Sequence, residues 1–269
     1  MPKPDRLAAV TGASSGLGAE FARQLAARGY DLLLVARRLP RLEQLRSELE
    51  RAHGIRVEPW RADLADEPQT EVLARRLETG PPVDVLVNNA GFGTRGWFHT
   101  TDYARQVEMH KLHVLATLRL TRAVLPAMIA RSSGAIINVS SVGSFFRSPA
   151  SVSYCATKGW MTDFTEGLRL ELDELHAPVV VQALCPGFTY TEFHDVLGSG
   201  RDQVAKQLWM PADFVVRESL RALASGKLIV IPGWRYKLIV AIGTRLPLSW
   251  RLWMERQSPH AKTRGERAG

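Results

Sequence analysis

Short apolar runs alternate along the chain with longer segments whose hydrophobic residues recur at helical spacing. Several of the runs are almost continuously hydrophobic, which is typical of parallel strands covered on both faces. They predict strands at 7–10, 31–36, 55–60, 83–87, 135–140, 179–184 and 227–231. The segments between them predict helices at 16–28, 39–53, 66–79, 102–131, 152–176 and 211–225.

This alternation predicts an α/β fold, a doubly wound parallel sheet with helices on both faces. No internal repeat or long linker interrupts the pattern before about residue 226, so a single domain is expected. We place that domain at 1–232, an amphipathic extension at 233–256 and a disordered polar tail at 257–269.

The composition is that of a folded protein, and we expect it to be cytoplasmic. Of its 269 residues, 45% are hydrophobic and 23% are charged, as in ordinary globular domains. The first residues lack the apolar core of a secretory signal, and no stretch reaches the roughly 18 uncharged apolar residues of a spanning helix. Cys155 and Cys185 lack metal-site spacing and are expected to be reduced thiols in or near the core.

The net charge of +8 is concentrated near the C-terminus. Residues 201–269 hold thirteen Lys and Arg against five Asp and Glu, whereas the rest of the chain is balanced. These charges alternate with large apolar residues and do not form a basic stripe, so no nucleic-acid partner is expected.

A glycine-rich turn joins the first strand to the first helix. Its glycines follow G-x-x-x-G-x-G spacing in the segment Thr11-Gly12-Ala13-Ser14-Ser15-Gly16-Leu17-Gly18. Residues without Cβ let a pyrophosphate approach the backbone, and the helix N-terminus adds free N–H groups and a favourable dipole. The turn therefore predicts a dinucleotide phosphate site.

The end of the second strand indicates which dinucleotide binds. NAD sites commonly place a carboxylate there for the ribose 2′-hydroxyl, whereas this strand ends in Arg37 and Arg38. Guanidinium groups can hold a 2′-phosphate bidentately, so NADP(H) is favoured over NAD(H).

Candidate catalytic residues follow the fifth predicted strand. Tyr154 and Lys158 are four residues apart and share one face of a predicted helix, and Ser141 lies thirteen residues before the tyrosine. A nearby ammonium stabilises a phenolate, and a tyrosine with a lowered pKa is a competent general acid for a carbonyl that becomes an alkoxide. Asn88-Asn89-Ala90-Gly91 and Cys185-Pro186-Gly187 also follow strands, so all three segments are expected at one crevice.

The order and spacing of these motifs resemble the short-chain dehydrogenase/reductase family. The resemblance covers about residues 6–225 and rests on Thr11 to Gly18, Asp63, Asn88 to Gly91, Ser141, Tyr154, Lys158, Pro186-Gly187 and Thr191. It implies a Rossmann-type sheet of about seven strands and NAD(P)-linked interconversion of a carbonyl and an alcohol.

The resemblance also implies residue roles. Tyr154 would be the acid/base, Lys158 would bind the nicotinamide ribose and lower the tyrosine pKa, and Ser141 would hold the substrate oxygen. Asp63 would bond the adenine. Further cofactor contacts would come from Gly12, Ser14, Ser15, Gly16, Leu17, Gly18, Arg37, Arg38, Asn89, Ala90, Gly91, Pro186, Gly187, Thr189 and Thr191.

One position departs from the family pattern. Where the family usually has an asparagine that supports a water relay to the lysine, the segment MHKLHVLATLRLT places His113. A histidine there could preserve a helix distortion, relay a proton itself, slow the chemistry, or be a packed residue without a chemical role. His110 is the alternative occupant if the alignment is shifted by one turn.

The substrate side is rich in aromatic residues, which suggests a hydrophobic carbonyl or alcohol. Phe145 and Phe146 follow Ser141, the segment Phe188 to His194 follows the Pro-Gly turn, and Trp209-Met210 come later. The alternative is that these side chains only pack the loop.

The extension at 233–256 carries Trp234, Trp250 and Trp253 among leucines and interspersed Arg and Lys. This is an interfacial pattern, and three interpretations remain open: a lid over the pocket, a subunit contact in a homo-oligomer, or a peripheral membrane contact.

The expected function is an NADP(H)-dependent ketoreductase or alcohol dehydrogenase. One alternative is a dinucleotide-sensing or scaffold protein with the same fold, and another is a membrane-associated lipid-modifying reductase. Intact Ser141, Tyr154 and Lys158 argue against a sensor, which needs only the phosphate turn.

Overall fold

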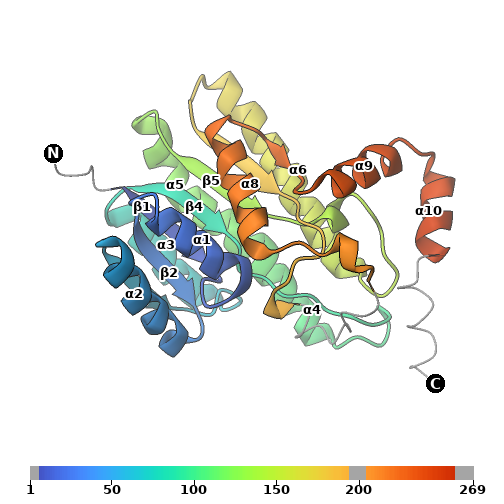
Figure 1. The fold of residues 1–269 in the computed structure, drawn as a ribbon, viewed down its shortest axis with the longest axis horizontal. Coiled ribbons are helices and arrows are strands. Elements are labelled where there is room, and N and C mark those ends of the chain that lie inside the picture. The colour runs from blue at the N-terminus through green and yellow to red at the C-terminus, as the bar shows by residue number, and fades with distance from the viewer. Residues whose placement is uncertain (1–5, 194–203, 258–269) are drawn as a thin grey trace.

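A parallel sheet forms the centre of the protein in the computed structural model, which describes residues 6–193 and 204–257 (Figure 1). The described residues contain seven strands in the order β3-β2-β1-β4-β5-β6-β7, all parallel. The sheet confirms the predicted doubly wound fold. The strands are β1 (Leu7–Thr11), β2 (Asp31–Ala36), β3 (Val57–Arg61), β4 (Val83–Asn88), β5 (Ala135–Val139), β6 (Val180–Leu184) and β7 (Ile229–Val230).

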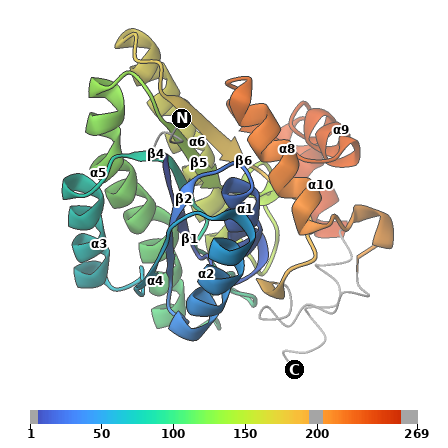
Figure 2. The same ribbon diagram turned by 60° about the vertical axis from the view of Figure 1, so that its left-hand side comes forward.

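Helices cover both faces of this sheet, as Figure 2 shows. One face carries α1 (Gly16–Ala26), α2 (Leu39–His53) and α8 (Ala212–Ala224). The other carries α3 (Glu67–Thr79), α5 (Thr117–Ala130) and α6 (Val152–Glu174). The leucine stripe of α2 is the reason for its position, because Leu42, Leu45 and Leu49 are all buried against the sheet.

The continuous apolar runs in the sequence are explained by these two helical layers. Successive side chains of a strand point to opposite faces of the sheet. In β5, Ile137 belongs to the core beneath α1, α2 and α8, and its neighbour Ile136 belongs to the core beneath α3, α5 and α6. A strand with two buried faces therefore needs no polar alternation.

The helix predicted at 102–131 is a continuous helical segment with a change of geometry. It consists of α4 (Tyr103–His110), a π-helical segment (Lys111–Ala116) and α5. Among the described helices, Tyr103–Ala130 is the one long and apolar enough to be a candidate membrane span by length and composition. Its Met109, Leu120 and Met128 side chains are fully buried, so packing in this domain already accounts for much of its apolar character.

The strand order determines where in the sheet a ligand site is expected. β1 lies between β2 and β4, so the chain changes direction across the sheet at β1. In doubly wound sheets, ligands bind at the carboxyl ends of the strands beside such a switch point. The turn after β1 and the loops after β4 and β5 all emerge at this edge.

Two helices follow the last strand, where an amphipathic extension without defined helices was predicted. They are α9 (Trp234–Gly243) and α10 (Leu248–Gln257), and Figure 1 shows α10 projecting from the body of the domain. Tyr236 and Val240 of α9 are buried, so α9 is packed against the domain at 1–232. The domain boundary stays a prediction, and residues 258–269 of the predicted tail lie outside the described residues.

Candidate active site

A cavity of about 530 Å³ opens at the carboxyl edge of the sheet. The loops after six successive strands contribute to its lining, so residues far apart in sequence meet there. The predicted residues in the lining are Gly12, Ser14, Ser15, Gly16, Leu17, Arg37, Arg38, Asp63, Asn89, Ala90, Gly91, Ser141, Tyr154, Lys158, Pro186, Gly187, Thr189 and Thr191. Gly18 and His113 do not line it.

The glycines of the turn after β1 allow the backbone to pack closely. Gly12 and Gly16 have positive φ angles of 66° and 55°, and a Cβ on Gly18 would lie 2.3 Å from the Gly12 carbonyl oxygen. The first intrahelical bond of α1 runs from the Ala19 N–H to the Ser15 carbonyl. The N–H groups of the preceding first turn have no intrahelical acceptor and are available to an anion. Gly18 therefore shapes the phosphate turn from behind the lining.

Arg37 and Arg38 differ in their surroundings. Arg38 donates to the Ser14 hydroxyl from Nε and Nη2, at 3.2 and 3.0 Å, and to the Ser15 hydroxyl from Nη2, at 2.8 Å. The Arg37 side chain is 63% exposed and lies 3.6 Å from the Asp63 carboxylate. Arg38 is thus fixed at the phosphate turn, whereas Arg37 borders the pocket beside Asp63.

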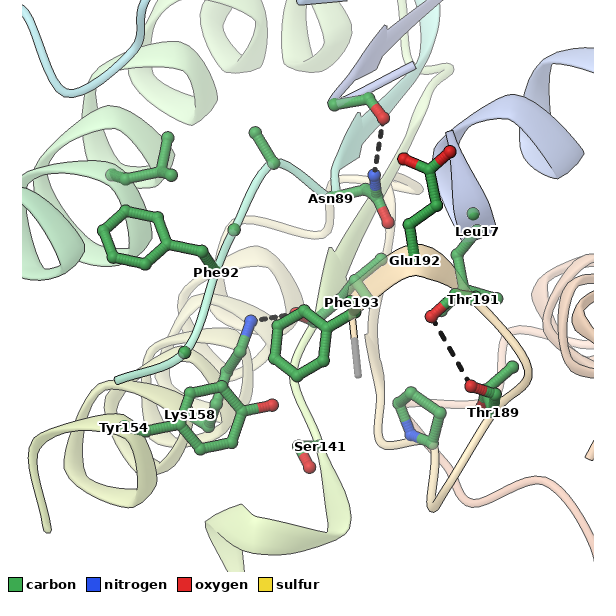
Figure 3. Close-up of a pocket in the computed structure, with 18 of the residues that line it drawn as sticks. Leu17, Asn89, Phe92, Ser141, Tyr154, Lys158, Thr189, Thr191, Glu192 and Phe193 are labelled. Atoms are coloured by element: carbon green, nitrogen blue, oxygen red, sulfur yellow. Dashed lines mark hydrogen bonds between the residues drawn. The ribbon is translucent and has the colours of Figure 1, made fainter. Parts of the chain in front are cut away.

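Ser141, Tyr154 and Lys158 come together in the lining of the same cavity (Figure 3). Ser141 follows β5, and its hydroxyl accepts a hydrogen bond from the Gly143 N–H at 3.1 Å. Tyr154 lies in the first turn of α6 and Lys158 one turn later, as their spacing predicts. Ser141 lies close enough to Tyr154 to lower the pKa of its hydroxyl.

The electrostatics of this group differ from the prediction. Burial raises the pKa of Tyr154 to about 12, although the neighbouring Ser141 hydroxyl acts to lower it. Burial also lowers the pKa of Lys158 to about 7. The lysine Nζ donates to the Val139 carbonyl at 2.7 Å and lies 5.9 Å from the centre of the tyrosine ring. The expected lowering of the tyrosine pKa by Lys158 is therefore not found, because burial disfavours both charges.

His113 lies behind the catalytic group. It is fully buried in the π-helical segment, and its Nδ1 is 2.9 Å from the Thr157 hydroxyl. Its Nε2 has no hydrogen-bond partner among the described residues, and a Cβ on Gly91 would lie 2.6 Å from that nitrogen. Burial keeps the pKa of His113 well below its ordinary value, so the ring is neutral at pH 7.

His110, the alternative occupant, is exposed and bonds through Nδ1 to the Gln106 carbonyl. His113 is thus the histidine that approaches the site, and its catalytic role stays a prediction. Asn88 also lies behind the pocket, where its side-chain amide donates to Thr121 and Asn138.

The apolar wall of the pocket is only partly the predicted one. Phe188, Phe193 and Trp209 line the cavity, whereas Phe145 and Phe146 do not. Phe146 turns away because its ring packs against Gly243 of α9, where a Cβ would lie 2.5 Å from the ring. His194 lies outside the described residues.

Several lining residues of the loop after β4, of α4 and of the π-helical segment were missed by sequence reasoning. Phe92 lines the cavity, and the Arg105 guanidinium lies 4.0 Å from the centre of its ring. Glu108 and Leu112 also line the cavity. The only sequence signal for Phe92 is its position directly after the Asn-Asn-Ala-Gly segment.

The residues present fit a nicotinamide dinucleotide. The lining contains the phosphate turn with Arg38, which suits phosphates, and a Ser-Tyr-Lys group, which suits a carbonyl. Both are surrounded by one continuous lining, so a long ligand can contact both at once.

Comparisons with known proteins agree with this geometry. The model of the short chain dehydrogenase family matches residues 6–202. The human dehydrogenase/reductase SDR family member 7 is 32% identical over 266 residues, which cover 93% of this chain and 76% of that protein.

Two solved structures give the same result for the fold. A short-chain dehydrogenase from Sphingobium yanoikuyae in complex with NADPH has a TM-score of 0.81 and 32% identity, over 88% of this chain and 93% of that chain. The bulky-bulky ketone specific alcohol dehydrogenase from Comamonas testosteroni has a TM-score of 0.77 and 26% identity, over 92% of this chain and 97% of that chain.

Proposed function

The chain belongs to the short chain dehydrogenase family of oxidoreductases, which use a nicotinamide dinucleotide, and from this premise we propose that it is an NADP(H)-dependent reductase of apolar ketones. The reverse reaction would oxidise the corresponding secondary alcohols. The observation that carries the proposal is that Arg38 and the Ser141, Tyr154 and Lys158 group line one and the same cavity.

In the proposed reaction the chemistry that a bound reduced dinucleotide would supply is a hydride for the carbonyl carbon. The Tyr154 hydroxyl donates its proton to the carbonyl oxygen, and the Ser141 hydroxyl donates a hydrogen bond to the same oxygen. Because burial holds Tyr154 protonated at pH 7, the proton is in place before substrate arrives. An ammonium on Lys158 would stabilise the phenolate left after transfer, and a proton from solvent would restore the phenol.

The proposed preference for NADP(H) is supported by the cluster at the phosphate turn. Arg38 and the hydroxyls of Ser14 and Ser15 would bind the 2′-phosphate, and the N–H groups at the start of α1 would bind the pyrophosphate. No carboxylate follows β2 at the positions of Arg37 and Arg38, so nothing there favours a free ribose hydroxyl.

An apolar substrate is supported by the cavity wall. Phe92, Phe188, Phe193 and Trp209 line the cavity that holds Tyr154, so a polar group of the substrate packed against them would lose water without compensation. The solved Comamonas testosteroni protein is described as specific for bulky-bulky ketones.

The C-terminal helices support a further proposal, docking on an anionic membrane surface from the cytoplasmic side. The lid interpretation has no support, because no residue of α9 or α10 lines the cavity in the described part of the chain. Trp234, Trp250 and Trp253 are each at least 60% exposed. Between 234 and 257 the chain carries five Arg and Lys against one Glu, which favours an anionic surface over a second copy of the same basic segment.

The experiment that tests the proposed function is a series of ketones of increasing apolar size, followed by NADPH absorbance. Turnover that improves with apolar size is expected. Tight NADPH binding without turnover of any ketone or alcohol would instead favour the dinucleotide-sensing alternative.

A further inference from the structure

The carboxylate of Glu192 is hydrogen-bonded to two arginines beside the phosphate turn. Its two oxygens accept hydrogen bonds from Arg38 Nη1 at 3.1 Å and from Arg41 Nη1 at 2.6 Å. The same Arg38 guanidinium bonds the hydroxyls of Ser14 and Ser15. We call these five residues the arginine cluster. Both arginines lower the pKa of Glu192, so the carboxylate is ionised at neutral pH.

The residue after Glu192 contacts the catalytic tyrosine. The ring of Phe193 packs against the ring of Tyr154, with the ring centres 5.9 Å apart. Figure 3 shows the two side chains leaving the loop in different directions, Phe193 toward Tyr154 and Glu192 away from it. Two adjacent residues therefore connect the arginine cluster to the catalytic tyrosine.

The loop also rests on the phosphate turn. Thr191 lies against Gly16, where a Cβ would be 3.1 Å from the Thr191 Cβ. The Tyr190 N–H donates to the Met210 carbonyl, and this bond holds the start of the loop. The segment 190–193 is thus held at Tyr190 by a backbone hydrogen bond and at Glu192 by the charge of its carboxylate.

We propose that Glu192 is an internal competitor for the 2′-phosphate of the dinucleotide, and that its displacement releases Phe193 from Tyr154. The inference rests on the proposed function, because it requires Arg38 to bind the 2′-phosphate. It makes Glu192 a specificity-determining residue in a loop that follows β6, far in sequence from the arginines.

The physical basis is repulsion between two anions on one guanidinium, because Glu192 accepts from Nη1 of Arg38 while the serine hydroxyls that would share the 2′-phosphate accept from Nε and Nη2. A phosphate on Arg38 would repel a carboxylate at hydrogen-bond distance from the same group, and it carries more charge and more acceptor oxygens. A dinucleotide without a 2′-phosphate leaves Glu192 in place. The loop then keeps Phe193 against Tyr154. Dinucleotides with and without a 2′-phosphate would therefore differ in how accessible they leave Tyr154, as well as in their affinity.

The first test measures dinucleotide affinity of the full chain. Glu192→Gln keeps the side-chain shape and removes the charge. We expect NADPH to bind about three- to tenfold more tightly and NADH to change by less than about twofold. Glu43→Gln is the matched control, because it removes a charge near the start of the same helix as Arg41 but pairs with Arg46. An equal gain for NADH, or the same gain in the control, would overturn the inference.

The second test measures the loop directly by hydrogen exchange over residues 187–193. Adenosine 2′,5′-bisphosphate should speed exchange there in the wild-type chain, whereas 5′-AMP should not, and Glu192→Gln should exchange fast without either nucleotide. Unchanged exchange with the bisphosphate bound would refute the release of the loop.

The variant Arg38→Ala distinguishes a failure of the Glu192 inference from a failure of the cofactor proposal. If it abolishes the preference for NADPH while Glu192→Gln changes nothing, the cofactor proposal stands and the competitor is refuted. If Arg38→Ala leaves NADPH affinity unchanged, both are refuted.

Discussion

The imidazole of His113 and the backbone of Tyr154 are joined through one hydroxyl. Thr157 Oγ1 donates to the Tyr154 carbonyl at 2.9 Å and lies 2.9 Å from His113 Nδ1. Because that hydroxyl has one proton and gives it to the carbonyl, Nδ1 must carry the ring proton and donate to Thr157. The neutral histidine therefore fixes the first turn of α6, from which the tyrosine projects.

Replacing His113 by alanine should destabilise the fold. The change removes a buried hydrogen bond and leaves a cavity in the core, which together should cost about 2–4 kcal/mol of the free energy of unfolding. Urea unfolding measures this. The control is His110→Ala, where the side chain is exposed and little change is expected. Equal stabilities of the two variants would contradict the structural role of His113.

Lys158 should give the folding stability a particular pH dependence. Its pKa is lowered from 10.5 to about 7, so in this interval the unfolded chain holds a proton that the folded chain has lost. Raising the pH from 7 to 9.5 should therefore stabilise the wild type relative to Lys158→Met by about 1 kcal/mol per pH unit. Above pH 10 the raised pKa of Tyr154 acts in the opposite direction, because the folded chain then keeps the extra proton. Parallel stability curves for the two proteins between pH 7 and 9.5 would refute the prediction.

Tyr154→Phe should remove the proton donor and leave the dinucleotide site intact. We expect kcat to fall by at least about a hundredfold, the usual contribution of a general acid, while the NADPH dissociation constant stays within about twofold. Steady-state kinetics and a binding titration measure the two quantities. Retention of a tenth or more of the wild-type rate would show that another group supplies the proton.

Arg38 and Arg37 should contribute unequally to the choice of cofactor. Arg38→Ala should weaken NADPH binding about ten- to hundredfold, because it removes a charge-assisted contact held in place by two serine hydroxyls. Arg37→Ala should have a smaller effect, since that side chain is 63% exposed and faces Asp63. NADH affinity serves as the internal control, and a similar loss for NADH would refute a role in reading the 2′-phosphate.

Removing the chain after Arg245 should leave the domain folded and abolish membrane binding. The cut keeps α9, whose Tyr236 is buried, and removes α10 with Trp250 and Trp253. Co-sedimentation with anionic vesicles should be lost, and in the full chain it should weaken with salt. Neutral vesicles are the control. If the full chain does not bind anionic vesicles, and truncation changes the oligomer mass measured by light scattering, the subunit contact is favoured.

Elements with a strong local pattern were predicted well from the sequence. The helix at 39–53 was predicted at its observed bounds, because its leucine stripe extends to Leu49 and Gly54, which adopts a left-handed conformation with φ 62°, ends it. The strand predicted at 55–60 begins later, at Val57, since residues 55 and 56 return the chain from that cap to the sheet. The catalytic group was predictable for a topological reason: parallel strands end at the same edge.

Features set by distant contacts could not be predicted. A helix distortion at His113 was one of the interpretations left open, but the residues alone do not indicate π-helical geometry over 111–116. Phe146 follows Ser141 directly, yet its contact with Gly243 takes it out of the cavity. The pair between Arg38 and Glu192 joins residues 154 positions apart, and the pKa of Tyr154 depends on burial that no motif encodes.

Tyr236 limits which segments of this chain can be exchanged with those of a relative. Its hydroxyl accepts from the Phe188 N–H at 3.0 Å and donates to the Leu208 carbonyl at 2.8 Å, and its ring fills the space where Gly187 has no side chain. A crossover between residues 188 and 236 that brings in a C-terminal segment without this tyrosine would orphan two backbone groups and open a hole behind the Pro-Gly turn. Functional chimeras should therefore inherit the turn and α9 from the same parent.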